Sequence, residues 1–568
     1  MICRVPVTSR SAVAVPPAHA TVSRGVRVNI AAVTAPTRWP ETHFRAGLVA
    51  SPHELASEAG VAAFDRGGNA VDAALAAAIS VAVVYPHMNG LGGDALWLIY
   101  DATARRLLAL NAAGRSASAA DLDAYRTRYG DSMPTRGGAA AITVPGVVSG
   151  WDAAHRYSVE SMGSKIAWRA RFEAALRYAE GFPASASQRR ITTAARDLFG
   201  AAAPADVQRT LWPVYHPDRL GADVVQTALA DTLRRIAAEG ADAFYTGDVA
   251  RRLAAGAAAL GSPLTTADLA AHRADWVTPL RVPYRDGEAV SFPPPAQGFA
   301  ALAILALLDG FDVGTLADSD YVHIVVEATK LAFEDRDRCL ADPTVVDVPV
   351  ERCLDLERLR RRRAHISRRA ARPLGAPVGA GDTIAIVSAD ARGNAVCVIQ
   401  SLYHEFGAGV VAGDTGVILQ NRGAFFSLDP AHPNCLAPRK RTATTLIPSM
   451  YLVGGRPRYV YGTMGGEGQP QTQAALLTRM LDRGLGPQAA IEAPRWLYGR
   501  TWGEMSRALR LESRFGDEVA ADLSARGHSV HMVDPWSDVM GHAQVISIDD
   551  DGLHGGSDPR ADGAAVGR

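Results

Sequence analysis

The stretch that decides the fold is "VGAGDTIAIVSADARGNAVCVIQSLYHEFG", residues 378–407. Two apolar runs, "TIAIVSAD" and "NAVCVIQS", flank the short segment "ARG", and this pattern predicts a β-hairpin. Thr383 is the first residue of the first run. A two-residue tip pairs Thr383 with Gln400, and a three-residue tip pairs it with Ser401. Either register brings a second hydroxyl group within reach of the first.

The hydroxyl group at the start of this strand has two interpretations. A threonine beside a second hydroxyl suits a nucleophile with a supporting donor. It is equally the pattern of an ordinary threonine–serine pair between neighbouring strands. The segment before Thr383, "PLGAPVGAGD" (residues 373–382), is rich in helix-breaking residues. The hairpin alone leaves both interpretations open.

Composition excludes several classes of function. The chain has 568 residues, of which 48% are hydrophobic, so it can bury a large core. Lys and Arg (59) balance Asp and Glu (59), so no overall field favours nucleic acid or an anionic membrane. Eight arginines in residues 358–372 therefore indicate a solvated helix face rather than a nucleic-acid patch. Five scattered cysteines without CxxC argue against a disulfide framework and a zinc site, and we expect no metal or cofactor.

The order of patterns along the chain indicates an α+β protein. Residues 1–44 have no acid before Glu41 and no signal-like apolar run, and we expect them to be a disordered tail. The most apolar stretch, residues 73–85, is too short to span a bilayer and predicts a buried Ala-rich helix. We therefore expect a cytoplasmic protein without a membrane partner.

Two further segments carry candidate donors. "YGTMGGEGQPQTQ" reads as a strand end, a glycine turn at Gly465 and Gly466, and a helix from about Pro470. Free backbone N–H groups at such a turn can hold an oxyanion, whereas a phosphate loop would need Gly-Lys-Ser/Thr. "RKRTATTLIPSM" adds the hydroxyls of Thr444 and Thr445. Neither segment is decisive alone.

A series of motifs in one order carries a resemblance that covers the chain from about Gly47 to Pro559. The motifs are "GGNAVDAALAAA", "YPHMNGLGGDALWLIY", "VPGVVSGWDAA", "FPPPAQGF", "DTIAIVSADARGNAV", "FGAGVVAGDTGVILQNR", "KRTATTLIP", "GTMGGEGQPQTQ" and "AIEAPRW". Together they resemble the γ-glutamyltransferase (γ-glutamyltranspeptidase) family of N-terminal-nucleophile hydrolases.

This resemblance implies a four-layer αββα sandwich and a precursor that cuts itself between Asp382 and Thr383. Residues 45–382 would become a large subunit and residues 383–568 a small subunit, held together as a heterodimer that could itself pair. The freed α-amine of Thr383, with an ordinary pKa of about 7.7, would activate the hydroxyl. By the same resemblance Ser401 supports the nucleophile, and the N–H groups of Gly465 and Gly466 hold the oxyanion. Thr444 and Thr445 match paired serines of the family's substrate pocket.

Departures from the family pattern concern the groups that bind a γ-glutamyl substrate. The family's arginine–glutamate pair falls at Ala113 and Gly114, and Arg115 comes two residues late. The carboxylate expected to hold the substrate amine falls at Phe425, and the usual asparagine falls at Tyr403. Both charged contacts are therefore expected to be missing.

The residues left near the expected nucleophile are Tyr403, His404, Arg422 and Phe425. Arg422 could bind a small carboxylate through two hydrogen bonds, or it could be a structural loop arginine. His404 could contact substrate or serve in packing. The pattern is similar to a divergent branch that includes oxamate amidohydrolase.

We therefore carry three hypotheses. The first is an enzyme that processes itself and then cleaves a small-molecule amide, as a γ-glutamyltransferase or glutathione hydrolase does. The second is hydrolysis of oxamate or another small acid amide on the same site. The third is a non-catalytic binding protein on the same fold.

Overall fold

Two seven-stranded antiparallel sheets form the centre of the computed structural model, which describes residues 37–199, 204–221, 223–372, 382–499, 506 and 508–568. The sheet that contains the predicted hairpin has the order β19-β2-β10-β11-β3-β4-β7. Its strands are β19 (Ala564–Gly567), β2 (Gly47–Ser51), β10 (Asp382–Asp390), β11 (Ala395–Tyr403), β3 (Asp94–Asp101), β4 (Arg106–Asn111) and β7 (Asp275–Val277).

The second sheet lies against the first and has the order β1-β18-β17-β13-β12-β9-β8. Its strands are β1 (Thr42–Phe44), β18 (Gly552–Ser557), β17 (Ala543–Asp549), β13 (Arg456–Thr463), β12 (Ser449–Val453), β9 (Gly287–Ser291) and β8 (Leu280–Tyr284). Alternate side chains of both sheets, among them Leu96, Ile399 and Val460, meet in an apolar layer between them.

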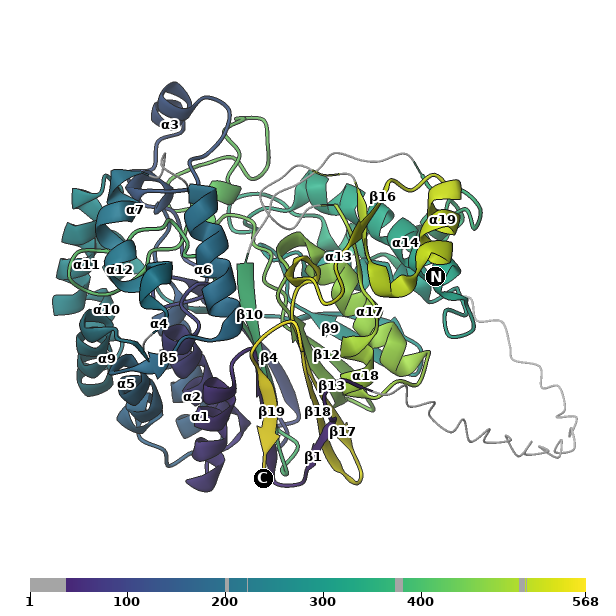
Figure 1. Ribbon diagram of the computed structural model, residues 1–568, viewed down its shortest axis with the longest axis horizontal. Helices are drawn as coiled ribbons and strands as arrows, with labels where there is room; N and C mark the ends of the chain where they lie inside the picture. The colour runs from purple at the N-terminus through teal and green to yellow at the C-terminus, as the bar shows by residue number, and fades with distance from the viewer. Residues whose placement is uncertain (1–36, 200–203, 222, 373–381, 500–505, 507) are drawn as a thin grey trace, which may run out of the picture. The chain divides into compact units, whose positions relative to one another are not determined.

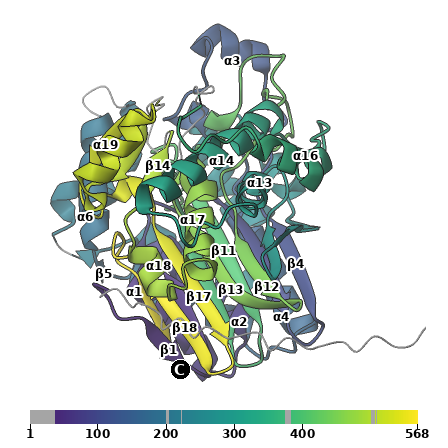
Figure 2. The ribbon, with the colours of Figure 1, turned by 90° about the vertical axis from the view of Figure 1, so that its right-hand side faces the viewer.

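Helices cover the outer face of each sheet, as Figure 1 shows. The face of the hairpin sheet carries α1 (Glu54–Asp65), α2 (Ala70–Val84), α4 (Val147–Glu160) and α5 (Glu173–Ala179), with α9 (Thr227–Glu239), α10 (Asp242–Tyr245) and α11 (Asp248–Ala259) outside them. The second sheet carries α13 (Gly298–Leu308), α14 (Asp318–Cys339), α17 (Gln469–Leu481) and α18 (Pro487–Glu492), which Figure 2 shows in front of its strands. The expected four-layer αββα sandwich is confirmed.

The hairpin has the longer of the two predicted tips. Ile384 pairs with Gln400 and Ala389 with Ala395, so residues 391–393 form a three-residue turn. Gly393 adopts a φ of +86°, which a side chain would disfavour. Asp382 pairs with Tyr403 and Ile384 with Gln400, so at a bulge in β11 Thr383 faces two residues, Ser401 and Leu402.

Strand β10 lies inside its sheet because β2 and β11 pair with its two edges. Helix α2 packs on β10 and β11, and Asp390 Oδ2 accepts a hydrogen bond (2.9 Å) from Ala70 N at the start of this helix. The apolar residues of α2 occupy its whole circumference and all are buried, as expected for residues 73–85. Residues 387–390 of β10 are thus held on both edges, and the strand is covered on its outer face.

The expected tail differs from the structure at its end. Residues 1–36 lie outside the described part, but Thr42–Phe44 form β1, which pairs with β18, so the disordered tail was extended too far. The amides of Arg38 and Trp39 donate to Glu492, and Glu41 Oε2 accepts from Gln488 N (3.0 Å). Backbone pairing with a long edge strand orders this short polar segment, which has no apolar pattern of its own.

The arginine-rich segment forms α16 (Leu356–Arg363), whose side chains pair with α14. Arg358 and Arg362 both contact Asp335, and Arg362 also contacts Glu334 (2.6 Å). Part of the run is therefore neutralised, as expected for a helix face rather than a nucleic-acid patch. No helix of the described residues is long and apolar enough to cross a bilayer.

Both parts of the chain before and after Thr383 contribute to both sheets. In the hairpin sheet β2, β3, β4 and β7 precede it, whereas β10, β11 and β19 follow it. A cut before Thr383 would leave the hydrogen bonds between these strands intact.

A buried ion pair anchors α2, and its loss should destabilise the fold. Arg171 contacts Asp72, and both side chains are fully buried. We expect Arg171→Met to lower the free energy of unfolding by about 3–5 kcal/mol, because the carboxylate of Asp72 stays buried without its cation. Urea unfolding measures the change, with exposed Arg169→Met as control. Equal stability of the two variants would contradict this role.

Candidate functional site

Thr383, Ser401 and Asp94 lie side by side on three neighbouring strands. Thr383 Oγ1 donates to Ser401 Oγ at 3.3 Å, and Ser401 pairs with Asp94 of β3. Directly paired residues of antiparallel strands project from the same face. All three side chains are buried, and Ser401 Oγ also accepts from Tyr403 N (2.8 Å). The two hydroxyls that the sequence placed within reach are in contact.

The chain turns sharply just after Ser401. Tyr403 has a φ of +85°, which is unusual for a bulky residue, and its ring stacks on that of His404 with centroids 4.4 Å apart. The ring of Phe425 meets Tyr403 edge-on at 5.7 Å. Phe425 belongs to the short 3-10 helix Arg422–Phe425. These rings, of which Tyr403 is buried and His404 and Phe425 are partly exposed, form a wall next to Ser401. Local backbone strain of this kind is typical of functional sites.

Arg422 is the most unusual charged residue of this region. Its side chain is 1% exposed, and its guanidinium carbon lies 4.6 Å from the centroid of the Tyr403 ring. Arg422 Nε lies 3.7 Å from Asp94 Oδ2, yet none of its N–H groups donates a hydrogen bond within the described residues. A buried guanidinium with unused donors is suited to bind an anion, because every unpaired donor is destabilising when buried.

Asp94 provides the counter-charge for Arg422. Its Oδ1 accepts from Gly114 N (2.8 Å) and Gln420 Nε2 (3.0 Å), whereas Oδ2 accepts no hydrogen bond within the described part of the chain. Burial raises the pKa of the Asp94 carboxyl to about 6, and the neighbouring Arg422 only partly offsets this effect. Burial also lowers the pKa of Arg422, an effect that Asp94 opposes. The pair is thus held together by charge without direct hydrogen bonds.

His404 is held by Asn421. Asn421 Nδ2 lies 2.9 Å from His404 Nδ1, and His404 N donates to Asn421 Oδ1 (3.0 Å). Since the amide nitrogen can only donate, Nδ1 of His404 accepts, and a neutral ring carries its proton on Nε2. In this tautomer His404 presents a donor, which suits contact with a substrate oxygen better than removal of a proton.

The glycine turn comes from the opposite sheet. A Cβ added to Gly462 of β13 would lie 2.7 Å from Ile399, and Cys397 Sγ lies 3.2 Å from Tyr461 O. β13 and β11 therefore run in the same direction along the interface.

Gly465 and Gly466 have φ values of +128° and +50°, which favour glycine. No acceptor for their N–H groups is found among the described residues. Gln297 Nε2 fixes the turn by donating to Gly466 O (3.0 Å) and Thr445 O (3.1 Å). The turn can offer free amides to an oxyanion.

The two threonines differ in their contacts. Thr444 Oγ1 accepts from Leu446 N at 3.4 Å, whereas the buried Thr445 Oγ1 has no hydrogen-bond partner within the described residues. Thr445 is therefore the stronger candidate for a substrate contact, and Gln297 ties it to the glycine turn.

Among the predicted residues, Arg115 lies away from this cluster, and the segment before Asp382 lies outside the residues that the structure describes. Arg115 is one-third exposed and pairs with Asp342 (3.3 Å) and Asp275 (3.8 Å), so its guanidinium is already occupied by carboxylates. Its neighbour Gly114 contacts Asp94 instead. Asp382 begins β10, and residues 373–381, which precede the expected cut, lie outside the described residues.

Sequence reasoning missed Asp94, Gln297 and Asn421. A signal existed for Asp94, since an acid directly after "GLGG" begins a continuously apolar strand, where a charge is unexpected. Gln297 lies in the quoted "FPPPAQGF", and Asn421 directly precedes Arg422, but neither position has a chemical signal of its own.

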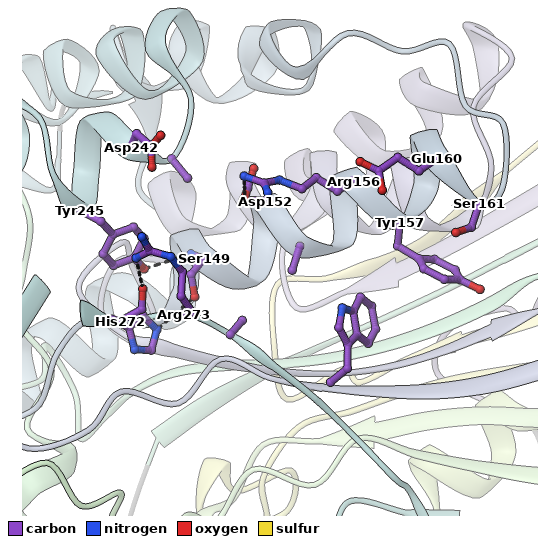
Figure 3. Close-up of a pocket in the computed structure, with 14 residues that line it drawn as sticks. Ser149, Asp152, Arg156, Tyr157, Glu160, Ser161, Asp242, Tyr245, His272 and Arg273 are labelled. Atoms are coloured by element: carbon purple, nitrogen blue, oxygen red, sulfur yellow. Dashed lines mark hydrogen bonds and ion pairs between the residues drawn. The ribbon is translucent and has the colours of Figure 1, made fainter. Parts of the chain in front are cut away.

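A separate cavity of about 310 Å³ beside α4 contains a serine–histidine pair (Figure 3). Ser149 Oγ lies 3.0 Å from His272 Nε2 and donates to Gly146 O (3.0 Å). Because the single hydroxyl proton is directed at a carbonyl, His272 is not placed to remove it. Burial lowers the pKa of His272 to about 3. We interpret this pair as structural.

Comparison with known proteins identifies the family. Residues 56–568 match the family described as gamma-glutamyltranspeptidase. The chain belongs to this family. The glutathione hydrolase-like YwrD proenzyme of Bacillus subtilis (strain 168) is 46% identical over 529 residues, which cover 92% of this chain and 98% of that protein. The oxamate amidohydrolase proenzyme of Klebsiella pneumoniae is 44% identical over 523 residues, with the same coverage.

A solved structure supports the same assignment. The cephalosporin acylase from Bacillus halodurans has a TM-score of 0.86 at 34% identity and covers 96% of this chain and 99% of its own. The resemblance stated from the motifs is confirmed, and the chain is an enzyme of the gamma-glutamyltranspeptidase family. Both relatives named above are proenzymes, and thus precursors that are processed.

The raised pKa of Asp94 predicts a pH-dependent stability. Its folded pKa of about 6 exceeds its ordinary value, so the folded state keeps a proton that the unfolded chain releases. Asp94 therefore stabilises the fold at low pH, and this stabilisation is lost as the pH rises through about 6. Between pH 4.5 and 7.5 we expect the wild type to lose about 2 kcal/mol relative to Asp94→Asn.

Urea unfolding of both proteins at the two pH values measures this difference. Asp131→Asn is the control, because Asp131 lies exposed in a turn. A constant difference between the wild type and Asp94→Asn at both pH values would contradict the assignment.

Proposed function

We propose that the protein is an amidohydrolase that cuts its own chain before Thr383 and then uses this threonine as the nucleophile. The observation that supports the proposal is the contact between Thr383 Oγ1 and Ser401 Oγ at the start of a strand that pairs with β11 there and with β2 over residues 387–390. The proenzyme relatives agree with such processing.

In maturation the hydroxyl of Thr383 attacks the carbonyl carbon of Asp382. The peptide C–N bond breaks, the Thr383 nitrogen leaves as a free amine, and water hydrolyses the ester that remains. The new α-amine, with an ordinary pKa of about 7.7, is then beside the hydroxyl and can take its proton. The interleaved strands hold the two fragments together as a heterodimer.

In turnover the Thr383 hydroxyl attacks the carbonyl carbon of a substrate amide, and Ser401 donates to or accepts from the reacting oxygen as the charge moves. The N–H groups of Gly465 and Gly466 stabilise the oxyanion, with the turn fixed by Gln297. The tetrahedral intermediate expels the amine or ammonia, and water hydrolyses the acyl-threonine ester. In a transferase, a second amine would take the acyl group from Thr383 in place of water.

The substrate class follows from the charges around the hydroxyl pair. Arg422 offers a buried cation with unused donors, and Tyr403, His404 and Phe425 supply a mostly apolar wall. Asp94 already faces Arg422, and Glu405, the acid directly after His404, pairs with Arg136 (3.3 Å), so neither of these carboxylates is available to bind an ammonium group. We therefore propose an amide of a small carboxylic acid, of which oxamate is the simplest, giving oxalate and ammonia.

A γ-glutamyl compound such as glutathione is the second candidate, supported by the glutathione hydrolase-like relative. It carries an ammonium group as well as a carboxylate, and the positions expected to bind them hold Ala113, Gly114 and Phe425. Two charged groups without partners in a closed pocket disfavour this substrate. The cytoplasmic location and a dimer of heterodimers stay predictions.

Maturation gives the first test of this proposal. We expect fragments of 382 and 186 residues from the chain of 568, and an uncut chain for Thr383→Ala. Ser401→Ala should cut more slowly, because Thr383 loses the partner at 3.3 Å. Mass spectrometry and N-terminal sequencing identify the cut, and a small fragment beginning with anything but "TIAIV" would refute the nucleophile. Thr444→Ala is the control hydroxyl variant and should be cut normally.

Substrate choice gives the second test. On one processed preparation, kcat/KM should be larger for oxamate than for a γ-glutamyl anilide. Arg422→Met should raise KM for oxamate by at least about tenfold, because a charge-assisted hydrogen bond to the carboxylate is lost. Arg115→Met is the matched arginine variant and should change KM little, since carboxylates occupy this side chain.

The outcomes separate the two candidates. Faster turnover of the γ-glutamyl compound would favour the second candidate. An unchanged KM in Arg422→Met would remove the carboxylate role from this residue.

A further inference from the structure

The two cysteines at the ends of residues 339–353 are neighbours. Cys339 ends α14 and Cys353 ends the short helix α15 (Val350–Cys353). Their Sγ atoms lie 3.9 Å apart, and both thiols are free. The sequence gives no hint of this contact, because thirteen residues separate the two positions and neither belongs to a motif.

We propose that Cys339 and Cys353 are a reversible oxidation site that forms a disulfide with a peroxide as the oxidant. A disulfide needs the two sulfurs about 2.05 Å apart, so they must approach each other by roughly 2 Å. Both residues end helices, where side-chain rotation and a small backbone shift can supply this movement. The proposal depends on neither the substrate nor the nucleophile.

The surroundings favour reaction at this pair. The pair is open to a small oxidant on the side of Cys339, which is partly exposed, and Cys353, 4% exposed, lies directly beside it. Contact with the Cys339 thiol, and to a smaller extent Arg358, lowers the pKa of Cys353, although burial and Asp335 act in the opposite direction. Arg358 is fixed by Asp335 (2.7 Å). A thiolate is thus favoured beside a thiol that can resolve it.

The chemistry balances without any other group. The Cys353 thiolate attacks one oxygen of hydrogen peroxide, which gives a sulfenic acid and hydroxide. The Cys339 sulfur then attacks the sulfenic sulfur, the S–S bond forms, and the hydroxyl leaves as water with the thiol proton. In sum, two thiols and one peroxide give one disulfide and two waters, and a dithiol reverses the reaction.

The pair adjoins the wall of the candidate site. Cys353 packs in one apolar cluster with Leu340 and Ala443, against which Cys339 and Phe425 also pack. Figure 2 shows α14, which carries Cys339, on the outer face of the second sheet. The enclosed segment also carries Asp342, whose Oδ2 accepts from Arg441 N (2.8 Å). A disulfide would clamp the segment that supports this wall.

Peptide mapping after peroxide treatment tests the proposal. In the reduced wild type we expect hydrogen peroxide to remove two free thiols, to produce one disulfide peptide joining Cys339 and Cys353, and to raise Tm. Dithiothreitol should reverse all three changes. Cys339→Ser should form no such peptide and should show a sulfenic acid at Cys353 that dimedone traps. Cys435→Ser is the control at another partly exposed free cysteine and should behave like the wild type.

Several results would overturn the proposal. One is a disulfide that involves Cys435 instead. Another is irreversible sulfinic acid at Cys339 without a cross-link. The third is a loss of thiols in Cys339→Ser that equals the loss in the wild type. Cys353→Ala serves as a second variant, so that misfolding of one variant, seen by circular dichroism, does not decide the outcome.

Discussion

The site depends on the pairing of β10 inside its sheet. Thr383 is the second residue of this strand. Its neighbours Asp382 and Ile384 pair with β11, residues 387–390 pair with β2, and α2 packs on the strand. A nucleophile attached to a mobile segment would need to be ordered before each reaction, at an entropic penalty of about 1–2 kcal/mol per residue. Here the sheet orders it during folding, and the same register brings Ser401 to 3.3 Å.

The same sheet also carries the charge that shapes the substrate pocket. Asp94 is paired with Ser401 on the next strand, and it is buried with one oxygen unused beside Arg422. Such an arrangement is destabilising by itself, because two charges are desolvated without the hydrogen bonds that would compensate them. A small anion that fills the space could supply these bonds. If the site acts as proposed, this lower stability would accompany affinity toward a carboxylate.

The residues around this pair explain how the chain departs from its family's pattern. Where charged side chains are expected for a γ-glutamyl group, the structure has Phe425 packed against Tyr403, and Gly114 donating to Asp94. Gly114, where the resemblance predicts a glutamate, donates its backbone N–H to Asp94 instead. Arg422, the buried cation beside Asp94, belongs to the short helix that follows β11 and not to the loop after β4.

The hairpin, its two possible registers, the glycine turn and the Ala-rich helix were predictable from the sequence, because each depends on neighbours within about twenty residues. Local periodicity and turn chemistry suffice for such contacts. The choice between Gln400 and Ser401 as partner of Thr383 needed the structure, since it depends on one residue in the turn. The pairing of Asp94 with Arg422, the occupation of Arg115 by Asp342, and the contact of Cys339 with Cys353 were decided only by tertiary structure. These contacts join segments whose separation is set by how helices and sheets pack, and no local pattern records that distance.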